Sequence, residues 1–410
     1  SLKRKLPMKI CVIGAGQCGF QVCDSLRRLG CSDEIFLLGS ESSLPYQRPP
    51  LSKGFILGNL EQDRLLFRPS SFYSKNQIEV CMNTAVTNLN LAGNYIETEH
   101  GEQLLYDKLV LATGTKVNTL PELPASDKVF YLRSLKDSIR IKESIAKVNS
   151  LVIIGGGFIG LEVAAVARQL GKKVTLIERT GSLMSSSVPA EISRFYQNYH
   201  AEKKVELLLN FSISRIEKES QRFLISSSDG EEVSGDIVLV GVGVEPNIGL
   251  VKNTSLLCEN GIIADGYGAT NFENIFVAGD CSNFYNTYLK QHVRIESVQH
   301  AVDTAKVVAA NIMKKQITYD SVPWFWSDQY NLKLQIAGLL TDYDSSATIG
   351  EMSESGFSTF YFKNHEHVAT ISVNKPSDHM YSRKLLEKGS NLNAEIVAAK
   401  KFNIKEFMRS

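Results

Sequence analysis

One pattern occurs twice in this sequence, first as Lys9-Ile-Cys-Val-Ile-Gly-Ala-Gly-Gln-Cys-Gly-Phe20 and again as Leu151-Val-Ile-Ile-Gly-Gly-Gly-Phe-Ile-Gly-Leu-Glu162. Each copy begins with a short apolar run rich in β-branched residues, passes through glycines, and opens into small and apolar residues at helical spacing. A second apolar run then follows, Ile35 to Leu38 in the first copy and Val174 to Ile177 in the second. The sequence therefore predicts two βαβ units, and hence two parallel sheets.

The glycines of both copies have the spacing of a dinucleotide-binding turn. The first glycine of such a motif makes the turn, the second lets a pyrophosphate approach the backbone, and the third permits close packing of helix and strand. The phosphates then meet the positive end of the helix. A single motif is a weak signal, since glycine turns without a ligand are common, but the second copy favours two bound dinucleotides. The candidate residues are Gly14, Gly16 and Gly19 in the first copy and Gly155, Gly157 and Gly160 in the second.

An acidic residue after the second strand of each unit is the expected acceptor for the adenosine ribose. Glu178 ends the strand of the second copy directly. A carboxylate there accepts hydrogen bonds from ribose hydroxyls and repels a 2′-phosphate, which favours NADH over NADPH; the adjacent Arg179 could hold that phosphate and argues the other way. Glu41 is the candidate of the first copy, but it lies beyond Gly39 and Ser40, where simple solvent exposure is the alternative.

The rest of the chain fits around these units. Turn signals at His100-Gly101 and Asp229-Gly230 predict hairpins, and beyond Tyr319 aromatic-rich β segments indicate a separate α+β domain. The fold class is thus α/β, with two Rossmann-type dinucleotide-binding domains of the glutathione-reductase type plus a C-terminal α+β domain. Two dinucleotides brought face to face imply hydride transfer from a nicotinamide to a flavin. We divide the chain into an FAD-binding domain in two parts (8–117 and 243–318), an NADH-binding domain (118–242) and the C-terminal domain (319–410).

Composition argues against several other classes. A net charge of +1 and a pI near 7.6 offer no overall electrostatic case for nucleic acid. No apolar run is long enough to span a bilayer, and residues 1–9 are basic without the apolar core of a signal peptide, so we expect a cytoplasmic protein that does not bind membranes. The cysteines have neither CxxC nor zinc spacing, so we expect no metal site and no redox pair facing a flavin. They are Cys11, Cys18, Cys23, Cys31, Cys81, Cys258 and Cys281.

Further motifs in chain order together resemble one family, the flavoprotein ferredoxin reductases that serve Rieske oxygenases and bacterial cytochromes P450. Rubredoxin reductases and apoptosis-inducing factor are similar more distantly. The motifs are Tyr46-Gln-Arg48-Pro-Pro-Leu-Ser-Lys53, Ala112-Thr-Gly114, Gly243-Val-Glu-Pro-Asn247, Phe276-Val-Ala-Gly-Asp280, Arg294-Ile-Glu-Ser-Val-Gln299, Pro323-Trp-Phe-Trp-Ser-Asp-Gln329, and Val373-Asn-Lys-Pro376 with Arg383.

The resemblance implies FAD and NADH as cofactors, hydride transfer from NADH to FAD, and single-electron transfer to a 2Fe-2S ferredoxin. The alternatives left open are a rubredoxin reductase and an NADH-sensing flavoprotein; an NADH oxidase or peroxidase would need a redox cysteine. The implied flavin residues, besides the first glycine motif and Glu41, are Arg48, Lys53, Thr113, Gly114, Asp280, Ser297, Val298 and Trp326. The implied NADH residues, besides the second motif, Glu178 and Arg179, are Phe158, Ile159, Glu162 and Gly243. Of these, Lys53, Glu162 and Trp326 would surround the flavin ring, with no protein acid or nucleophile required.

Two further expectations concern the partner and the tryptophans. An acidic ferredoxin would need a local basic surface, since the overall charge is close to zero. The candidates are Lys290, His292, Arg294, Lys306 and Lys333. Trp324 and Trp326 are expected to face opposite sides of a strand, one in the core and Trp326 near the flavin; a packing role for both is the alternative.

Overall fold

The computed structural model describes residues 6–410, so the first five residues of the basic N-terminal stretch lie outside the described residues. Two compact units share the chain. The first contains residues up to 47, 63–116 and 245–323, and the second contains 48–62, 117–244 and 324–410. Two of the places where the chain passes from one unit to the other lie within short strands that pair with each other, β8 (Thr115–Val117) and β17 (Val244–Pro246).

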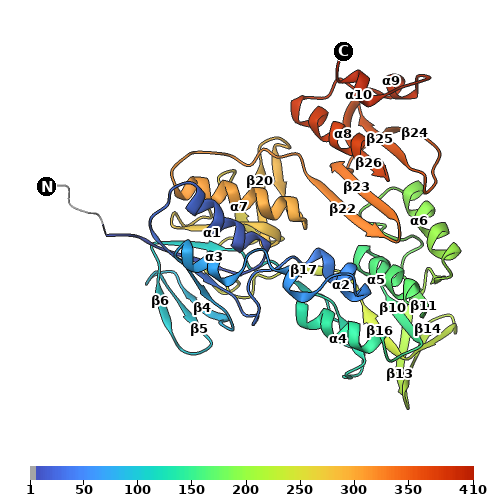
Figure 1. Cartoon of the computed structure of the whole chain (residues 1–410), viewed down its shortest axis with the longest axis horizontal. Helices are drawn as coiled ribbons and strands as arrows, with labels where there is room; N and C mark the ends of the chain where they lie inside the picture. The colour runs from blue at the N-terminus through green and yellow to red at the C-terminus, as the bar shows by residue number, and fades with distance from the viewer. Residues whose placement is uncertain (1–5) are drawn as a thin grey trace. The chain divides into compact units, whose positions relative to one another are not determined.

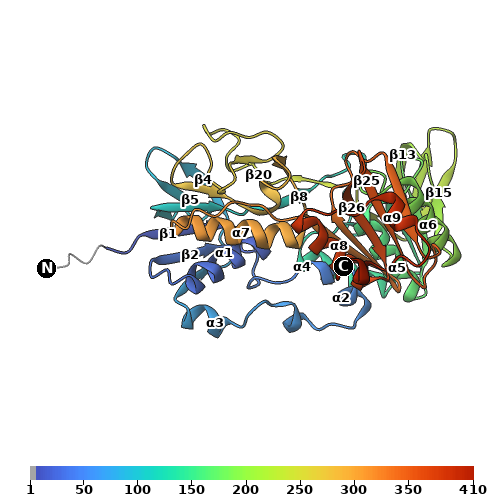
Figure 2. The same cartoon turned by 90° about the horizontal axis from the view of Figure 1, so that it is seen from above.

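The first unit is built on a parallel sheet whose central strand, β1 (Lys9–Ile13), is followed directly by the first glycine motif. Its Ile10, Cys11 and Val12 are fully buried, as expected of a strand covered on both faces. Helices α1 (Gln17–Arg28) and α7 (Val298–Ile312) lie side by side against this sheet (Figures 1 and 2). The strand order is β19 (Ile275–Val277), β7 (Lys108–Leu111), β1 (Lys9–Ile13), β2 (Glu34–Leu38) and β3 (Ile78–Cys81).

Smaller elements complete the first unit. One antiparallel sheet contains the predicted hairpin at Gly101, and a mixed sheet with one parallel and one antiparallel pairing precedes α7. Their strands are β4 (Val86–Asn90), β5 (Tyr95–Thr98) and β6 (Gln103–Leu105), and β18 (Ile262–Ala264), β20 (Ser282–Asn286) and β21 (Gln291–Val293). The short helices are α3 (Ser70–Lys75), η2 (Gln62–Leu65), whose first residue belongs to the second unit, and η3 (Gly279–Cys281).

The second unit contains another five-stranded parallel sheet, and its central strand again precedes a glycine motif. Its strand order is β12 (Glu206–Leu208), β11 (Lys173–Ile177), β10 (Ser150–Ile154), β16 (Ile237–Val240) and β9 (Val129–Tyr131). Helix α5 (Phe158–Gln169) follows β10 and the second glycine motif. The other helices of this part are η1 (Pro49–Ser52), α2 (Gly54–Leu57), α4 (Leu135–Ile145) and α6 (Ala190–Glu202). A separate antiparallel sheet consists of β13 (Ile213–Glu219), β14 (Arg222–Ser227) and β15 (Glu232–Gly235).

The C-terminal part of the second unit is an antiparallel sheet followed by helices. It shares one hydrophobic core with α5, α6 and the parallel sheet, and Figure 1 shows β22 beside α5. Its strand order is β22 (Trp324–Gln329), β23 (Leu332–Gly338), β26 (Glu366–Val373), β25 (Phe357–Lys363) and β24 (Ser345–Ile349). The helices are α8 (Pro376–Lys388), α9 (Ala394–Ala398) and α10 (Ile404–Phe407).

The predicted fold class is confirmed: two Rossmann-type sheets are followed by a C-terminal domain with an antiparallel sheet. The expectation that Trp324 and Trp326 face opposite sides of their strand is wrong. Their rings pack together with centroids 5.7 Å apart. Successive side chains of a strand alternate between faces, so residues two apart share a face.

The cysteines are all free thiols. Most of them are buried, Cys81 is half-buried and Cys258 is exposed. Burial raises the pKa of Cys11 to about 12 and also raises the pKa values of Cys18 and Cys23. These thiols are small core side chains with little tendency to ionise.

Within residues 6–410, no helix combines the length and hydropathy needed to cross a bilayer.

Candidate functional site

The glycine motif of the first unit forms a turn in which two of the three glycines leave no room for a side chain. Gly14 has a φ of +106°, and a Cβ there would lie 2.0 Å from the carbonyl oxygen of Ala112. A Cβ on Gly19 would lie 1.7 Å from the carbonyl oxygen of Gly14. At Gly16, by contrast, a Cβ would meet nothing within 4 Å. The first and third glycines thus hold strand and helix together, while the second faces open space at the N-terminus of α1, where a pyrophosphate fits.

The second glycine motif repeats this geometry. Gly155 has a φ of +108°, with a Cβ position 2.0 Å from the carbonyl oxygen of Gly241. The Cβ position of Gly160 lies 2.3 Å from the carbonyl oxygen of Gly155, and that of Gly157 is open within 4 Å. Gly157 is the N-cap of α5. Each unit therefore contains a glycine turn of the same geometry, here called its cradle, and the two cradles agree position by position.

Glu178 lies at the mouth of the second cradle. Its carboxylate accepts hydrogen bonds from the backbone N–H of Gly156 at 2.6 Å and from that of Thr180 at 2.9 Å. The Thr180 hydroxyl donates to it as well, at 3.2 Å. A half-buried carboxylate in this position can accept ribose hydroxyls. Arg179 is exposed, directly beside it.

The first unit places its acidic residue differently, for a steric reason. Ile13 pairs with Leu38 as Ile154 pairs with Ile177, so Gly39 occupies the position of Glu178. A Cβ on Gly39 would lie 2.6 Å from the Cβ of Ala15. The second unit has Gly156 in place of Ala15, and this gives Glu178 its room.

Glu41, the predicted acid of the first unit, is consequently farther along the loop. Its carboxylate accepts a hydrogen bond from the Tyr46 hydroxyl. Glu41 is half-buried, so the structure differs from the alternative of a fully solvated side chain.

The other predicted flavin residues of the first unit lie at strand ends and at a helix start. The Thr113 hydroxyl donates to the carbonyl oxygen of Asn247 at 2.7 Å, and Gly114 has a φ of +65°. Asp280 lies in η3, just after β19. Ser297 is the N-cap of α7, where its hydroxyl accepts the N–H of His300 at 3.0 Å, and Val298 begins the helix. The carboxyl ends of parallel strands are where open α/β sheets bind ligands.

Arg48 and Lys53 belong to the second unit by their contacts. The Arg48 guanidinium donates to the carbonyl oxygen of Arg133 at 2.9 Å. Gly243, also in this unit, has a φ of +92°. In the first turn of α5, the Phe158 ring packs on Phe325 at 4.6 Å, and Ile159 is 44% exposed.

Glu162 is the centre of a buried polar cluster within the second unit. It is 3% exposed, and its carboxylate lies 3.2 Å from the Lys53 ammonium. The Ser52 and Ser327 hydroxyls also donate to it, the latter at 2.8 Å. Burial raises the pKa of this carboxyl, and Lys53 with the two serines opposes that rise. A buried carboxylate with a counter-charge and hydroxyl donors is a fixed polar group, suited to orienting a ligand amide.

Sequence reasoning did not find the cluster beyond Glu162 and Lys53. Ser52, Ser327 and Gln329 all stand in quoted motifs, but they were not singled out. The available signal was the alternation in β22, which puts Phe325, Ser327 and Gln329 on one face and both tryptophans on the other.

The tryptophan face of β22 has its own contacts. The guanidinium carbon of Arg383 lies 4.3 Å from the Trp324 ring centroid, and His379 meets the same ring edge-on at 5.7 Å. Trp326 is half-buried beside Trp324. Cation–π packing from α8 therefore holds Trp324, and Trp326 packs on Trp324.

The candidate docking residues do not all belong to one unit. Lys290, His292, Arg294 and Lys306 are in the first unit and Lys333 is in the second. The Arg294 guanidinium pairs with Glu296 at 2.8 Å, whereas Lys290, Lys306 and Lys333 are exposed.

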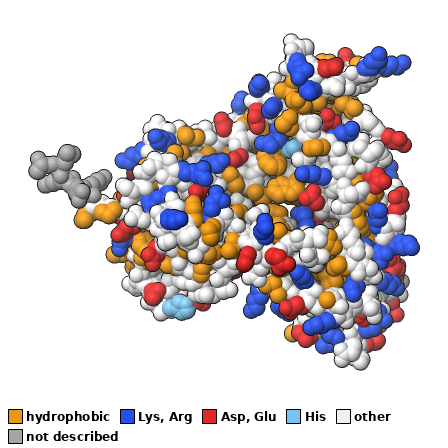
Figure 3. All heavy atoms as spheres, in the orientation of Figure 1, with side chains coloured by type: hydrophobic (Ala, Val, Ile, Leu, Met, Phe, Trp, Pro, Cys, Tyr) orange, Lys and Arg blue, Asp and Glu red, His pale blue; other side chains and the backbone are white. Residues whose placement is uncertain are grey.

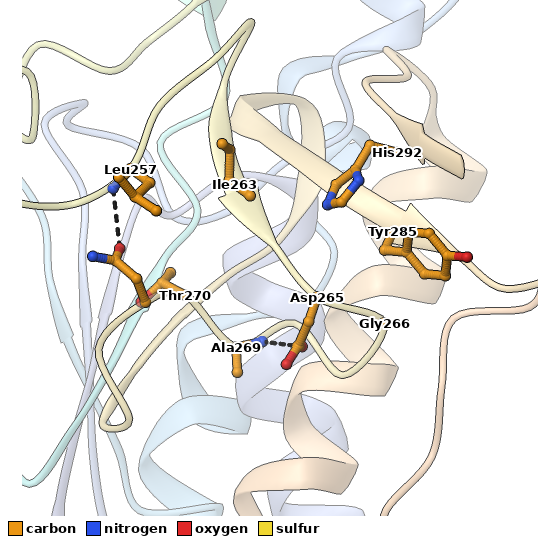
Figure 4. A pocket seen from close by; sticks show the side chains of 9 residues that line it. Leu257, Ile263, Asp265, Gly266, Ala269, Thr270, Tyr285 and His292 are labelled. Atoms are coloured by element: carbon orange, nitrogen blue, oxygen red, sulfur yellow. Dashed lines mark hydrogen bonds between the residues drawn. The ribbon is translucent and has the colours of Figure 1, made fainter. Parts of the chain in front are cut away.

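His292 also lines a depression of about 380 Å³ in the first unit (Figure 4). Tyr285 packs against it there, at 5.3 Å between rings. The carboxylate in this depression, Asp265, already accepts the backbone N–H groups of Tyr267 and Ala269. These bonds make Asp265 a turn-forming residue. Elsewhere in residues 6–410, no group of three or more His, Cys, Asp or Glu side chains is placed to hold a metal ion.

Comparisons with known proteins cover nearly the whole chain. The family described as pyridine nucleotide-disulphide oxidoreductase matches residues 8–305, and the reductase C-terminal family matches residues 324–408. Rhodocoxin reductase from Rhodococcus erythropolis is 38% identical over 401 residues, covering 97% of this chain and 94% of that protein. Rubredoxin-NAD(+) reductase from Ectopseudomonas oleovorans is 32% identical over 373 residues, covering 90% and 96%.

Among solved structures, the covalent putidaredoxin reductase–putidaredoxin complex matches with a TM-score of 0.95 and 30% identity, over 99% of each chain. The first family match contains both cradles, and the second contains the C-terminal sheet. The chain belongs to the pyridine nucleotide-disulphide oxidoreductase family, with the reductase C-terminal domain.

Proposed function

We propose that this chain is a flavoprotein reductase that takes a hydride from NADH and passes single electrons to a 2Fe-2S ferredoxin. The observation that carries the proposal is the pair of glycine cradles with the same geometry. Relatives that cover nearly the whole chain are named rhodocoxin reductase and putidaredoxin reductase. Bound FAD supplies the step from a two-electron donor to a one-electron acceptor. The balance is one NADH and two oxidised ferredoxins giving NAD⁺, two reduced ferredoxins and one proton.

The chain's own residues hold and orient the two dinucleotides in this proposal. The first cradle and the start of α1 bind the pyrophosphate of FAD, and the start of α7 turns the positive end of its helix dipole toward a flavin edge. The second cradle binds NADH, with Glu178 on its adenosine ribose. Glu162 and Lys53, fixed by their mutual contact, present a charged pair to the nicotinamide site. Arg48, Thr113, Asp280 and Trp326 remain proposed flavin contacts.

Purified protein loaded with FAD tests the proposal directly. NADH-dependent cytochrome c reduction is measured with and without a 2Fe-2S ferredoxin. We expect turnover that depends on the ferredoxin and is faster with NADH than with NADPH. Rapid oxidation of NADH without any acceptor protein would contradict it and indicate an oxidase; binding of NADH without turnover would indicate a sensor.

A rubredoxin is the second candidate acceptor, because two relatives that each cover 90% of this chain are named for that acceptor. The same assay with a rubredoxin in place of the ferredoxin decides between them by kcat/KM. A cytoplasmic location is part of the proposal and is checked by cell fractionation.

A further inference from the structure

A line of buried polar side chains leads away from Glu162 through β22 to α6. The Ser327 hydroxyl, which donates to Glu162, lies 3.3 Å from the amide nitrogen of Gln329. The amide oxygen of Gln329 lies 2.8 Å from Nε2 of His200. Ser327, Gln329 and His200 are each 0% exposed. Nδ1 of His200 lies 3.4 Å from the hydroxyl of Tyr330, which ends the line.

The contacts of the Gln329 amide favour one direction for the hydrogen bonds of this line. The amide nitrogen of Gln329 also faces the thioether sulfur of Met184 at 3.9 Å, and a thioether only accepts. A flipped amide would turn its oxygen toward that sulfur and its nitrogen toward His200. The observed orientation therefore has both amide hydrogens donated, to Ser327 and Met184, and the oxygen accepting from His200.

This direction fixes the protons at both ends of the line. Because Ser327 accepts from Gln329, its single hydroxyl proton is free for Glu162. Because Gln329 accepts from His200, the imidazole carries its proton on Nε2, and Nδ1 accepts from Tyr330. Burial lowers the pKa of His200 to about 4, so the ring is neutral under ordinary conditions. Each hydrogen bond along the line, from Tyr330 through His200, Gln329 and Ser327, is thus donated in the direction of the Glu162 carboxylate.

We infer that His200 and Gln329 are positioning residues that act through Ser327 to keep Glu162 ionised and correctly oriented. This inference rests on the proposed function for its role, since Glu162 is there assigned to the nicotinamide site. It gives α6, and β22 as the first strand of the C-terminal sheet, a part in tuning that carboxylate.

Few charged groups act on Glu162, so a change in the hydrogen bonds of this line should produce a measurable change in its pKa. Of the described residues, Lys53 alone brings a charge to this carboxyl, from the segment before α2; η1 and β22 contribute the Ser52 and Ser327 hydroxyls. At the other end of the line, the charge of Arg168 acts to lower the pKa of Tyr330. If His200 loses its N–H, the Gln329 amide is free to flip and to accept from Ser327. The protonated form of Glu162 then gains a partner, because it can donate to the Ser327 oxygen.

The test uses the FAD-loaded protein and reads the carboxyl directly. Infrared spectra across a pH titration follow the carbonyl band of the protonated side chain, assigned by its loss in Glu162→Gln. We expect Ser327→Ala and His200→Phe each to raise the midpoint by about one pH unit, a tenfold change in the equilibrium. The acid limb of flavin reduction by NADH should move up by the same amount.

Two comparisons separate a positioning role from simple structural damage. In a Ser327→Ala background, adding His200→Phe should not move the midpoint again, whereas losses of thermal stability should add. His200→Gln restores an N–H donor toward Gln329 and should return the midpoint toward the wild-type value. If His200→Phe does not fold, Met184→Leu replaces it, with a smaller shift in the same direction.

An unchanged Glu162 titration in Ser327→Ala, or in both His200→Phe and Met184→Leu, would overturn the inference even if the protein turns over normally. A wild-type protein that NADH does not reduce would contradict the proposed function instead, and the infrared titration would still decide whether the line acts on Glu162.

Discussion

Glu162 and Glu178 are two glutamates of the same unit with opposite surroundings. Glu178 is half-buried and is held by backbone N–H groups at the mouth of the cradle. Glu162 is 3% exposed and depends on one ammonium group and two hydroxyls. The first arrangement suits a ligand that arrives from solvent, and the second suits a fixed internal charge.

Substitution of Glu178 should change coenzyme choice. Glu178→Ala removes a ribose acceptor and also a group that repels a 2′-phosphate. We expect kcat/KM for NADH to fall by about 10–100-fold, the effect of losing one or two hydrogen bonds of about 1–3 kcal/mol. The value for NADPH should fall less, so the preference narrows. A wild-type protein that already prefers NADPH would contradict the assignment and point to Arg179.

Substitution of Lys53 should make stability depend on pH. Lys53→Met leaves the buried Glu162 carboxylate without its counter-charge, so the pKa of Glu162, already raised by burial, rises further. A raised folded-state pKa gives stability that is present in acid and lost as pH rises through it.

The measurement for Lys53→Met is urea unfolding in mildly acidic and mildly alkaline buffer. We expect a cost on the order of 3 kcal/mol in the alkaline buffer and a smaller one in acid. The double variant Lys53→Met with Glu162→Gln should recover most of the loss. Equal costs in both buffers would show that the ion pair does not control Glu162.

At the scale of elements, the two βαβ units use the same turn for different ligands. In each, the first and third glycines touch backbone and the second faces open space. A methyl group at the first or third position would therefore clash with backbone, whereas one at the second would occupy the space proposed for the ligand.

A pair of glycine variants separates binding from folding. Gly16→Ala meets no atom within 4 Å, so the protein should keep its thermal midpoint and lose FAD. Gly19→Ala brings a Cβ to 1.7 Å from the carbonyl of Gly14, so it should destabilise the fold although alanine favours helices. Gly157→Ala is the matched control: it should raise KM for NADH and leave FAD content unchanged. Full FAD content in Gly16→Ala would contradict the first cradle as the FAD site.

The strands, helices and glycine turns could be predicted because their signals are local. The repeated pattern fixes β1, α1 and β2 within a short stretch, and the same holds around Gly155. Contacts of the site were predictable only in part. Ser327 meets Glu162 across 165 positions of sequence, and no local pattern announces such a pairing. The displaced Glu41 shows the same limit, since its place follows from a clash between Gly39 and Ala15 side-chain positions.

At the scale of the whole chain, positive and negative side chains are nearly equal in number. Lys and Arg number 45 against 44 Asp and Glu, and Figure 3 shows both signs interspersed on the face in view. Attraction of an acidic ferredoxin must therefore come from a local group of cations. The docking residues and the four-part domain division both stay predictions.

Salt should slow the ferredoxin reaction more than it slows a small acceptor. The Debye length falls from about 8 Å at physiological ionic strength to about 3 Å at 1 M, which screens docking charges. We expect ferredoxin-linked turnover to drop steeply over that range and ferricyanide reduction to change little.

The charge reversal Lys306→Glu localises the effect, since Lys306 is exposed. It should raise KM for ferredoxin and leave KM for NADH unchanged. Lys314→Glu offers a control at another exposed lysine just beyond α7. Insensitivity to salt and to reversal of each candidate cation would mean that docking is apolar or uses another surface.

The unequal burial of the thiols gives the protein a single chemical handle. Maleimide reagents react with thiolates that they can reach, and of the cysteines Cys258 is the exposed one. Burial raises its pKa too, so mildly alkaline buffer would speed the coupling. A thiol-reactive electrode would then hold every molecule by the same loop of the first unit, in one orientation. Current from NADH could be read from such a film without any protein acceptor, and without a substitution anywhere in the chain.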